Sequence, residues 1–227
     1  MPTLNEMVYD IKNIAYGGEQ SDDHRVSDHQ VAYWIRQVRA MLVRQELATR
    51  NKISSSFVQH LNEVNLTLVD PAEVSGLSTG AFILKSTEKL PETVQRGEKN
   101  TITSVESLDG TQTFSETTFF RRKYNKYNKY TKCEPRWYLK DGYLYITNEL
   151  LIEKISVSGI FEDPEEVANF GLSSGDTPFS WDDTYPIANS MASTVTDIIL
   201  KTKMGIARQM PNDETNDADE KQINETH

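Results

Sequence analysis

The sequence contains a single cysteine and few of the residue patterns that carry catalysis. Cys133 has no second cysteine in the chain with which to form a disulfide, and alone it cannot build a thiolate metal cage. The four histidines lack the spacing that brings two ligands to one metal ion. Neither a glycine-rich phosphate loop nor a nucleophile elbow is present. The sequence therefore predicts a protein that is not an enzyme and that uses no cofactor or metal.

Long apolar runs are also absent, and the apolar content is low. No stretch approaches the roughly 18 apolar residues that a membrane span needs, and Asn5, Glu6 and Asp10 stand where a secretion signal would be apolar. We therefore expect neither membrane insertion nor secretion. Hydrophobic residues make up 37% of the 227 residues, whereas soluble domains usually contain about 45–50%. A sparse core of this kind favours a chain that completes its burial against a partner.

Charge is unevenly distributed along the chain, whose net charge is −10. Residues 121–140 hold eight Lys or Arg against one Glu, which gives +7 there and −17 over the rest. The surface as a whole is therefore not expected to attract nucleic acid. Residues 211–227 carry six carboxylates against one lysine and almost no apolar side chains, which predicts an acidic, flexible tail.

The positive charge lies in a segment that we call the basic arm, residues 119–136. Within it Lys and Tyr both recur every three residues, which in an extended loop offers cations for phosphates with aromatic rings beside them. Two partners fit this pattern: an acidic neighbouring subunit, which the charge of the remaining chain favours, and nucleic acid. The candidate contact residues are Arg121, Arg122, Lys123, Tyr124, Lys126, Tyr127, Lys129, Tyr130 and Lys132.

Apolar residues at three- and four-residue steps predict three helices. The first spans about 4–16 and opens with a capping box at Thr3 and Glu6, and the second spans about 28–49 with its arginines mostly off the apolar stripe. The short polar connection between them predicts an antiparallel helix hairpin. A last, long helix follows Pro186. The residues expected to pack between subunits are Trp34, Ile35, Val38, Leu42, Met191, Val195, Ile198 and Ile199.

Between the helices, β-branched and alternating residues predict a β-rich, mainly antiparallel segment. Strands are expected near residues 57–61, 66–69, 81–84, 102–105 and 150–161. Asp141-Gly142 predicts a two-residue turn between strands 137–140 and 143–146, with one core face and one amphipathic face. Asp70-Pro71 and Asp163-Pro164 each predict the start of a short helical turn.

Together these elements predict an α+β fold with a helical base and a projecting sheet. Residues 1–51 with 184–210 are expected to form a helical, ring-forming body, and residues 52–183 a β-rich projecting region that includes the basic arm. The acidic tail, 211–227, completes the expected organisation.

Two stretches of the sequence carry a family likeness. The first runs from Leu4-Asn5-Glu6-Met7-Val8-Tyr9-Asp10-Ile11 through Gly17-Gly18 and Trp34-Ile35-Arg36 to Leu42-Val43-Arg44-Gln45. The second is Ile160-Phe161-Glu162-Asp163-Pro164-Glu165-Glu166. Together they resemble a neck ring protein of crAss-like bacteriophages. The helices–sheet–helix order also resembles the tail gatekeeper proteins of short-tailed phages.

The resemblance implies a structural virion protein of the neck or tail, made in the host bacterial cytoplasm. It implies a homo-oligomeric ring, expected to be a dodecamer, in the head-to-tail connector through which DNA passes. The implied partners are further copies, the portal or adjacent neck and tail ring proteins, and transiently the packaged DNA, with no membrane. A negative overall charge suits a conduit along which DNA slides without adhering. The alternative is a nonspecific nucleic-acid-binding protein that acts through the basic arm.

Overall fold

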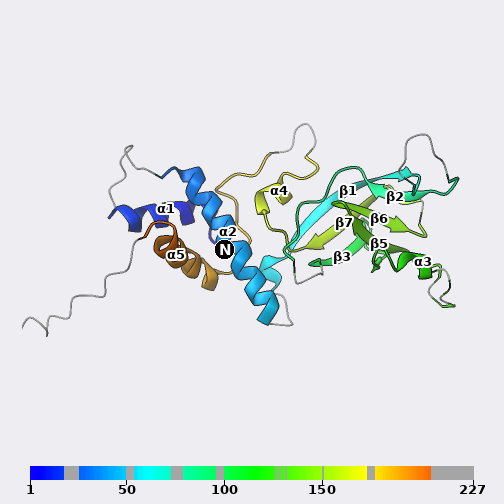
Figure 1. Ribbon diagram of the computed structural model, residues 1–227. Helices are drawn as coiled ribbons and strands as arrows, with labels where there is room; N and C mark the ends of the chain where they lie inside the picture. The colour runs from blue at the N-terminus through cyan, green and yellow to red at the C-terminus, as the bar shows by residue number, and fades with distance from the viewer. Residues whose placement is uncertain are drawn as a thin grey trace, which may run out of the picture.

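The chain forms an α+β fold with its long helices at one end and its sheet at the other (Figure 1). The short helix α4 (Pro164–Ala168) lies between the two groups (Figure 1). The computed structural model describes residues 1–17, 26–49, 54–72, 79–95, 100–125, 127, 129–130, 132–149, 151–172 and 177–205. The expected acidic tail lies outside the described residues, as does most of the connection between the first two helices.

Helix α1 (Leu4–Tyr16) begins at the predicted capping box. The Thr3 hydroxyl accepts the Glu6 N–H at 3.1 Å, and the Glu6 carboxylate accepts the Thr3 N–H at 2.9 Å. These two bonds satisfy backbone donors that the helix itself leaves free. The helix ends at Gly17, whose φ of 68° is a left-handed conformation that glycine adopts without a steric penalty. The predicted bounds are confirmed.

Helix α2 (Asp28–Thr49) also has its predicted bounds, whereas helix α5 (Asn189–Thr202) is shorter than the sequence suggests. The apolar stripe predicts a start directly after Pro186. In the structure Ala188 is still extended and acts as the N-cap residue, so Ile187 precedes the helix. Ile187 nevertheless packs in the same core as the helix, which explains why it extends the apolar pattern.

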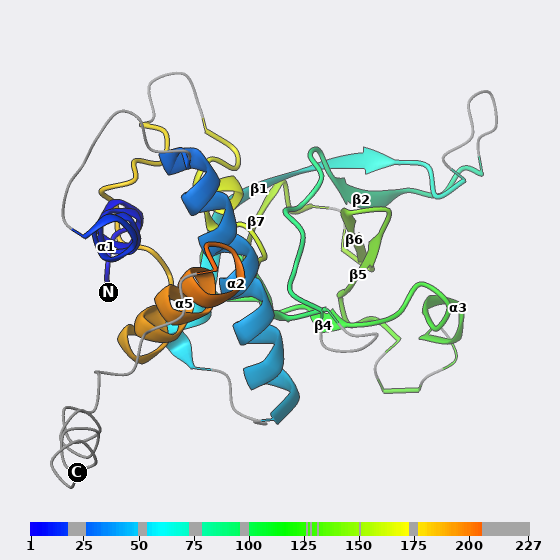
Figure 2. The ribbon, with the colours of Figure 1, turned by 60° about the vertical axis from the view of Figure 1, so that its left-hand side comes forward.

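Helices α1, α2 and α5 pack around one apolar core. The predicted antiparallel hairpin of α1 and α2 is wrong: α1 is seen end-on where α2 runs across the view, so the two helices cross steeply (Figure 2). The cause is a long-range tether. The segment before α5 binds the start of α1 through bonds from Asn5 N–H to the Trp181 carbonyl and from Tyr185 N–H to the Pro2 carbonyl, both 3.0 Å. This tether, and contact with α5, fix the direction of α1.

The β-rich segment forms one seven-stranded sheet of order β3-β7-β1-β2-β6-β5-β4. The strands are β1 (Gln59–Val69), β2 (Ile83–Ser86), β3 (Ile102–Ser107), β4 (Ser115–Glu116), β5 (Arg136–Lys140), β6 (Tyr143–Thr147) and β7 (Lys154–Gly159). All neighbours are antiparallel except β4 and β5. Phe114 N–H bonds to the Val105 carbonyl at 2.9 Å, which joins the segment before β4 to β3. The sheet is therefore nearly closed, and the mainly antiparallel prediction is confirmed.

Strand β1 merges two strands that the sequence separates, and a short 3-10 helix, η1 (Ser55–Phe57), precedes it. Its first half pairs with β7 and its second half with β2. The pairing register with β7 shifts between Leu61 and Val64, which is the signature of a β-bulge that bends the strand. The interrupted alternation that suggested two strands is therefore a bulge within one long strand.

The β5–β6 hairpin has the predicted turn and register. Asp141 and Gly142 have φ values of 55° and 82°, which a two-residue turn of this kind requires. Trp137 lies opposite Ile146, as predicted, and their side chains are buried in the sheet's core. The hairpin is therefore encoded locally.

The two Asp-Pro sequences behave as helix starts to different extents. Asp163 caps α4 by accepting the Glu165 N–H at 2.9 Å, as predicted. Asp70 accepts the Ala72 N–H at 2.8 Å, so a turn begins there. The rest of that predicted turn, residues 73–78, lies outside the described residues.

Candidate interaction surfaces

The root of the basic arm is fixed on the outer face of β5 and β6. Tyr138 and Tyr145 are buried and stacked with their ring centroids 5.0 Å apart, and Phe119 packs beside Tyr138 at 5.9 Å. The Arg122 guanidinium lies 4.3 Å from the Phe119 ring centroid and donates a 2.7 Å hydrogen bond to the Tyr138 hydroxyl. An arginine over an aromatic ring contributes about 0.5–2 kcal/mol. The arm therefore leaves the sheet from a defined position.

This packing changes the expected character of the second hairpin face. The sequence predicts an amphipathic face for Tyr138, Tyr145, Lys140 and Tyr143. Tyr138 and Tyr145 instead form a small apolar cluster with Ile83, and lysines lie at its edge. The Lys85 ammonium lies 4.1 Å from the Tyr143 ring centroid. A second buried cluster thus lies outside the main core of the sheet, because the start of the basic arm covers it.

Beyond its root the basic arm exposes aromatic rings and cations. Tyr127 and Tyr130 are 74% and 85% exposed, and the Lys129 ammonium lies 5.6 Å from the Tyr130 ring centroid. Other exposed arm residues are Phe120, Arg121, Tyr124 and Lys132. Lys126 and the side chain of Lys123 lie outside the described residues. The structure thus places the described tyrosines and cations of the arm at the surface.

The start of the basic arm is helical, whereas the phosphate-binding interpretation of its sequence assumed an extended loop. Residues Arg122–Asn125 form the short helix α3, and Tyr127 N–H bonds to the Tyr124 carbonyl at 3.0 Å. The three-residue spacing of the tyrosines matches this i to i+3 turn better than a strand. The cause is the anchoring of Arg122, which holds the chain against the sheet where the arm begins.

Buried hydrogen bonds connect α2 with the segment after β7, and the sequence analysis did not predict this connection. Arg39 is fully buried, donating to the Pro186 carbonyl at 2.8 Å and to the Phe161 carbonyl at 3.0 Å. Burial lowers the pKa of its guanidinium. The sequence did carry a signal, because Arg39 lies four residues from Ile35 and Val43, on the buried side of the helix rather than off it.

Two further arginines of α2 bind the same segment through carboxylates. Arg36 Nη1 lies 2.7 Å from the Asp163 carboxylate, and Arg44 Nη2 lies 3.1 Å from the Glu162 carboxylate. Tyr185 is packed near Arg39, whose guanidinium carbon is 5.7 Å from the ring centroid, and burial raises the pKa of the Tyr185 hydroxyl. The helices and the sheet are therefore connected by a polar joint rather than by apolar packing alone.

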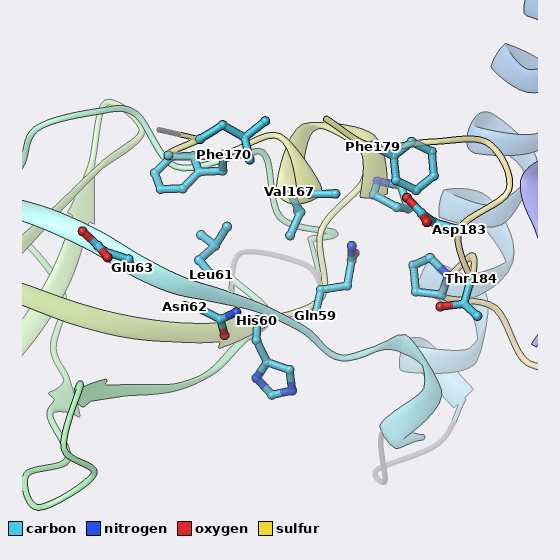
Figure 3. A pocket seen from close by; sticks show the side chains of 15 residues that line it. Gln59, His60, Leu61, Asn62, Glu63, Val167, Phe170, Phe179, Asp183 and Thr184 are labelled. Atoms are coloured by element: carbon cyan, nitrogen blue, oxygen red, sulfur yellow. The ribbon is translucent and has the colours of Figure 1, made fainter. Parts of the chain in front are cut away.

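A pocket of about 640 Å³ lies between β1, α4 and the segment that leads to α5. Figure 3 shows Phe170 and Glu63 towards one end of the pocket and Phe179 and Asp183 towards the other. The described part of its lining has no Lys or Arg. Gln59 also lines the pocket, and its amide oxygen is buried without a hydrogen-bond partner among the described residues. The pocket can thus accept an apolar or aromatic group.

The eight helical residues expected between subunits separate into two groups. Ile35, Val38, Val195 and Ile199 are buried in the chain's own core, where they hold α2 against α5. Trp34, Leu42, Met191 and Ile198 are half-buried at the edge of that core. The four buried residues therefore stabilise the single subunit, whereas the four half-buried residues retain accessible surface for further contacts.

Within the described residues, no group of three or more His, Cys, Asp or Glu side chains is placed to hold a metal ion. No described helix is long and apolar enough to cross a bilayer.

Comparison with known proteins identifies the class of the chain. Residues 6–225 match the family model described as phage tail ring protein 2, so the chain is a structural protein of a bacteriophage tail and a component of the virion. The chain belongs to this ring protein 2 family of the crAss-like phages, which confirms the resemblance of its two sequence stretches. A comparison with curated proteins gave no significant match.

Proposed function

We propose that the chain is the subunit of a homo-oligomeric ring, a dodecamer, in the connector between phage head and tail. The observation that carries this proposal is the separation of charge: residues 121–140 carry +7 and the rest of the chain −17. Opposite charges on two surfaces of one subunit favour contact between neighbouring copies. A contact between two different surfaces of identical subunits is heterologous, and it closes into a ring when the rotation between subunits permits.

In this ring the helical body, residues 1–51 with 184–210, forms the base, and residues 52–183 project from it. The exposed face of α2 supports this role, because Tyr33 and Met41 are exposed at an eight-residue spacing with Gln37 between them. Gln37 donates to the Tyr33 hydroxyl at 2.7 Å. This row and the half-buried edge residues supply apolar surface that a neighbouring subunit would cover.

The ring is proposed to let DNA pass and to stack against the portal or adjacent neck and tail ring proteins. The negative charge of the chain outside the arm supports passage, because like charge weakens adhesion to phosphates. In this arrangement the arm contacts protein rather than DNA.

The mass of the purified chain, measured by light scattering over a salt series, tests the ring. We expect a mass of about twelve subunits, alone or with the portal protein, that falls as salt screens the arm. A monomer under all these conditions would contradict the ring. The variant Arg121→Gln with Lys129→Gln and Lys132→Gln is expected to lower the assembled mass while leaving the fold intact.

Affinity for double-stranded DNA, measured over the same salt series, tests the assignment of the arm. We expect weak binding that the triple variant does not change. If the parent binds DNA with a steep salt dependence that the variant removes, and the mass stays the same, then the arm binds nucleic acid instead.

A further inference from the structure

The pocket beside α4 combines an apolar lining with carboxylate groups. Leu61, Val167, Phe170 and Phe179 supply the apolar surface, and the volume of about 640 Å³ lies within the roughly 300–1,000 Å³ of binding pockets. An apolar and aromatic lining of this kind favours an occupant with an apolar or aromatic body.

The charge of the pocket selects a cationic occupant. Among the described residues, two carboxylates line it, and neither Lys nor Arg does. Glu63 is paired with Lys154 at 2.6 Å, whereas Asp183 accepts a 2.8 Å hydrogen bond from Ser180 N–H and has no ion pair within the described ranges. An occupant therefore needs an aromatic or apolar body and a positive charge.

The tip of the basic arm has both features. Tyr130 is 85% exposed and supplies an aromatic ring. Lys129 lies beside it and can approach a carboxylate. Tyrosine also packs well on aromatic residues such as Phe179, and such aromatic pairs contribute beyond the area they bury.

The arm and the pocket of one chain lie in different parts of the molecule. The arm begins at α3, at the end of the sheet distant from the helices, whereas the pocket lies beside α4, near the helices (Figure 1). The hydrogen bond between Arg122 and Tyr138 fixes the root of the arm at that distant end. We propose that the arm tip of one subunit, with Tyr130 and Lys129, docks in the pocket beside α4 of the next subunit.

This inference rests on the proposed ring and names the two surfaces that meet in it. The contact is heterologous, because the arm of each subunit enters the pocket of a neighbour and its own pocket receives another arm. The occupant is therefore a second copy of this chain.

Cross-linking between the natural cysteine and the pocket rim tests this contact. Cys133 is exposed at the end of the arm, three residues from Tyr130, and Leu172 is exposed at the rim of the pocket. The variant Leu172→Cys is treated with a bismaleimide whose spacer is about 10 Å, the span of three extended residues. On denaturing electrophoresis we expect a ladder of covalent species whose mass rises from the dimer to higher oligomers.

Two controls define the result. The parent chain, with Cys133 alone, is expected to give nothing larger than a dimer. The same holds for Asp10→Cys, which places a second exposed cysteine on α1, a helix with no residue in the described lining of the pocket. The variant Gln59→Lys in the Leu172→Cys chain puts a like charge in the path of the arm and is expected to remove the higher oligomers.

The outcomes separate this inference from the ring itself. If Leu172→Cys gives no species above a dimer while light scattering still reports a ring, the pocket has another occupant and the docking is wrong. A cross-linked product that runs as a monomer would assign the pocket to the arm of the same chain and would also overturn the inference. If no variant assembles by light scattering, both the ring and the docking fail.

Discussion

Replacing Arg39 tests whether the polar joint between the helices and the sheet stabilises the fold. Arg39 is buried, no carboxylate of the described residues is in hydrogen-bond contact with it, and its two short bonds go to the carbonyls of Pro186 and Phe161. Arg39→Met keeps the length and apolar stem of the side chain but removes every donor. Both carbonyls then lose the guanidinium that binds them in the interior.

The size of the effect follows from these contacts. Each buried carbonyl that loses its donor costs about 1–3 kcal/mol, and a third contact, 3.5 Å from Nη1 to the Glu162 carbonyl, is too long to count. Removing the guanidinium also relieves its desolvation, which offsets part of that loss. We therefore expect Arg39→Met to lower the free energy of unfolding by about 2–4 kcal/mol.

Urea unfolding followed by far-ultraviolet circular dichroism measures this difference. The matched control is Arg44→Met in the same helix. The ion pair between Arg44 and Glu162 is exposed, so its loss is expected to cost about 0–1 kcal/mol. Arg39→Lys, which can keep one of the two bonds, should fall between them. The reasoning is refuted if Arg39→Met destabilises the chain no more than Arg44→Met does.

The Tyr185 hydroxyl has no hydrogen-bond partner among the described residues, so Tyr185→Phe should be as stable as the parent or more so at pH 7. Because folding raises the Tyr185 pKa, the parent loses stability above about pH 10, where the unfolded tyrosine ionises, and Tyr185→Phe should lose less in melting curves across that range. Gly142→Ala should cost about 1–2 kcal/mol, and so lower Tm by about 2–8 °C, through backbone strain at a φ of 82°. Its new Cβ would lie 3.7 Å from Lys89, an ordinary contact. Arg122→Ala should release the root of the basic arm and speed tryptic cleavage after Lys129.

Each of these predictions has an outcome that contradicts it. A loss of more than about 1 kcal/mol in Tyr185→Phe would show that the hydroxyl is satisfied in the fold. An unchanged Tm in Gly142→Ala would mean that the turn relaxes without strain. Equal cleavage rates for Arg122→Ala and the parent would show that Arg122 does not hold the arm, and Arg122→Lys, which keeps the charge, serves as the control.

The features that the sequence predicted well depend on residues close together in the chain. The capping box at Thr3 and the turn at Asp141-Gly142 each involve contacts within a few residues, so their residue types alone specify the conformation. The bounds of α2 follow from an apolar repeat along one helix.

The features that the sequence missed depend on distant partners. The spacing of Arg39 from Ile35 and Val43 indicates burial but not its partners, because the carbonyls of Phe161 and Pro186 that it binds belong to distant segments. The tyrosines of the β5–β6 hairpin looked half-exposed, because Phe119 and Arg122 cover them only after the chain folds back. The pocket beside α4 had no sequence signal, since three separate segments line it.

The sequence by itself determined the α+β class, the helices, the hairpin and the segregation of positive charge into residues 119–136, and it carried the family likeness. These properties are local or compositional, so they do not depend on how the elements meet. Only the tertiary structure decided how α1 crosses α2, how the sheet nearly closes, which arginine is buried and where the pocket lies. Each of these is set by contacts between segments far apart in the chain, whose pairing no local pattern encodes.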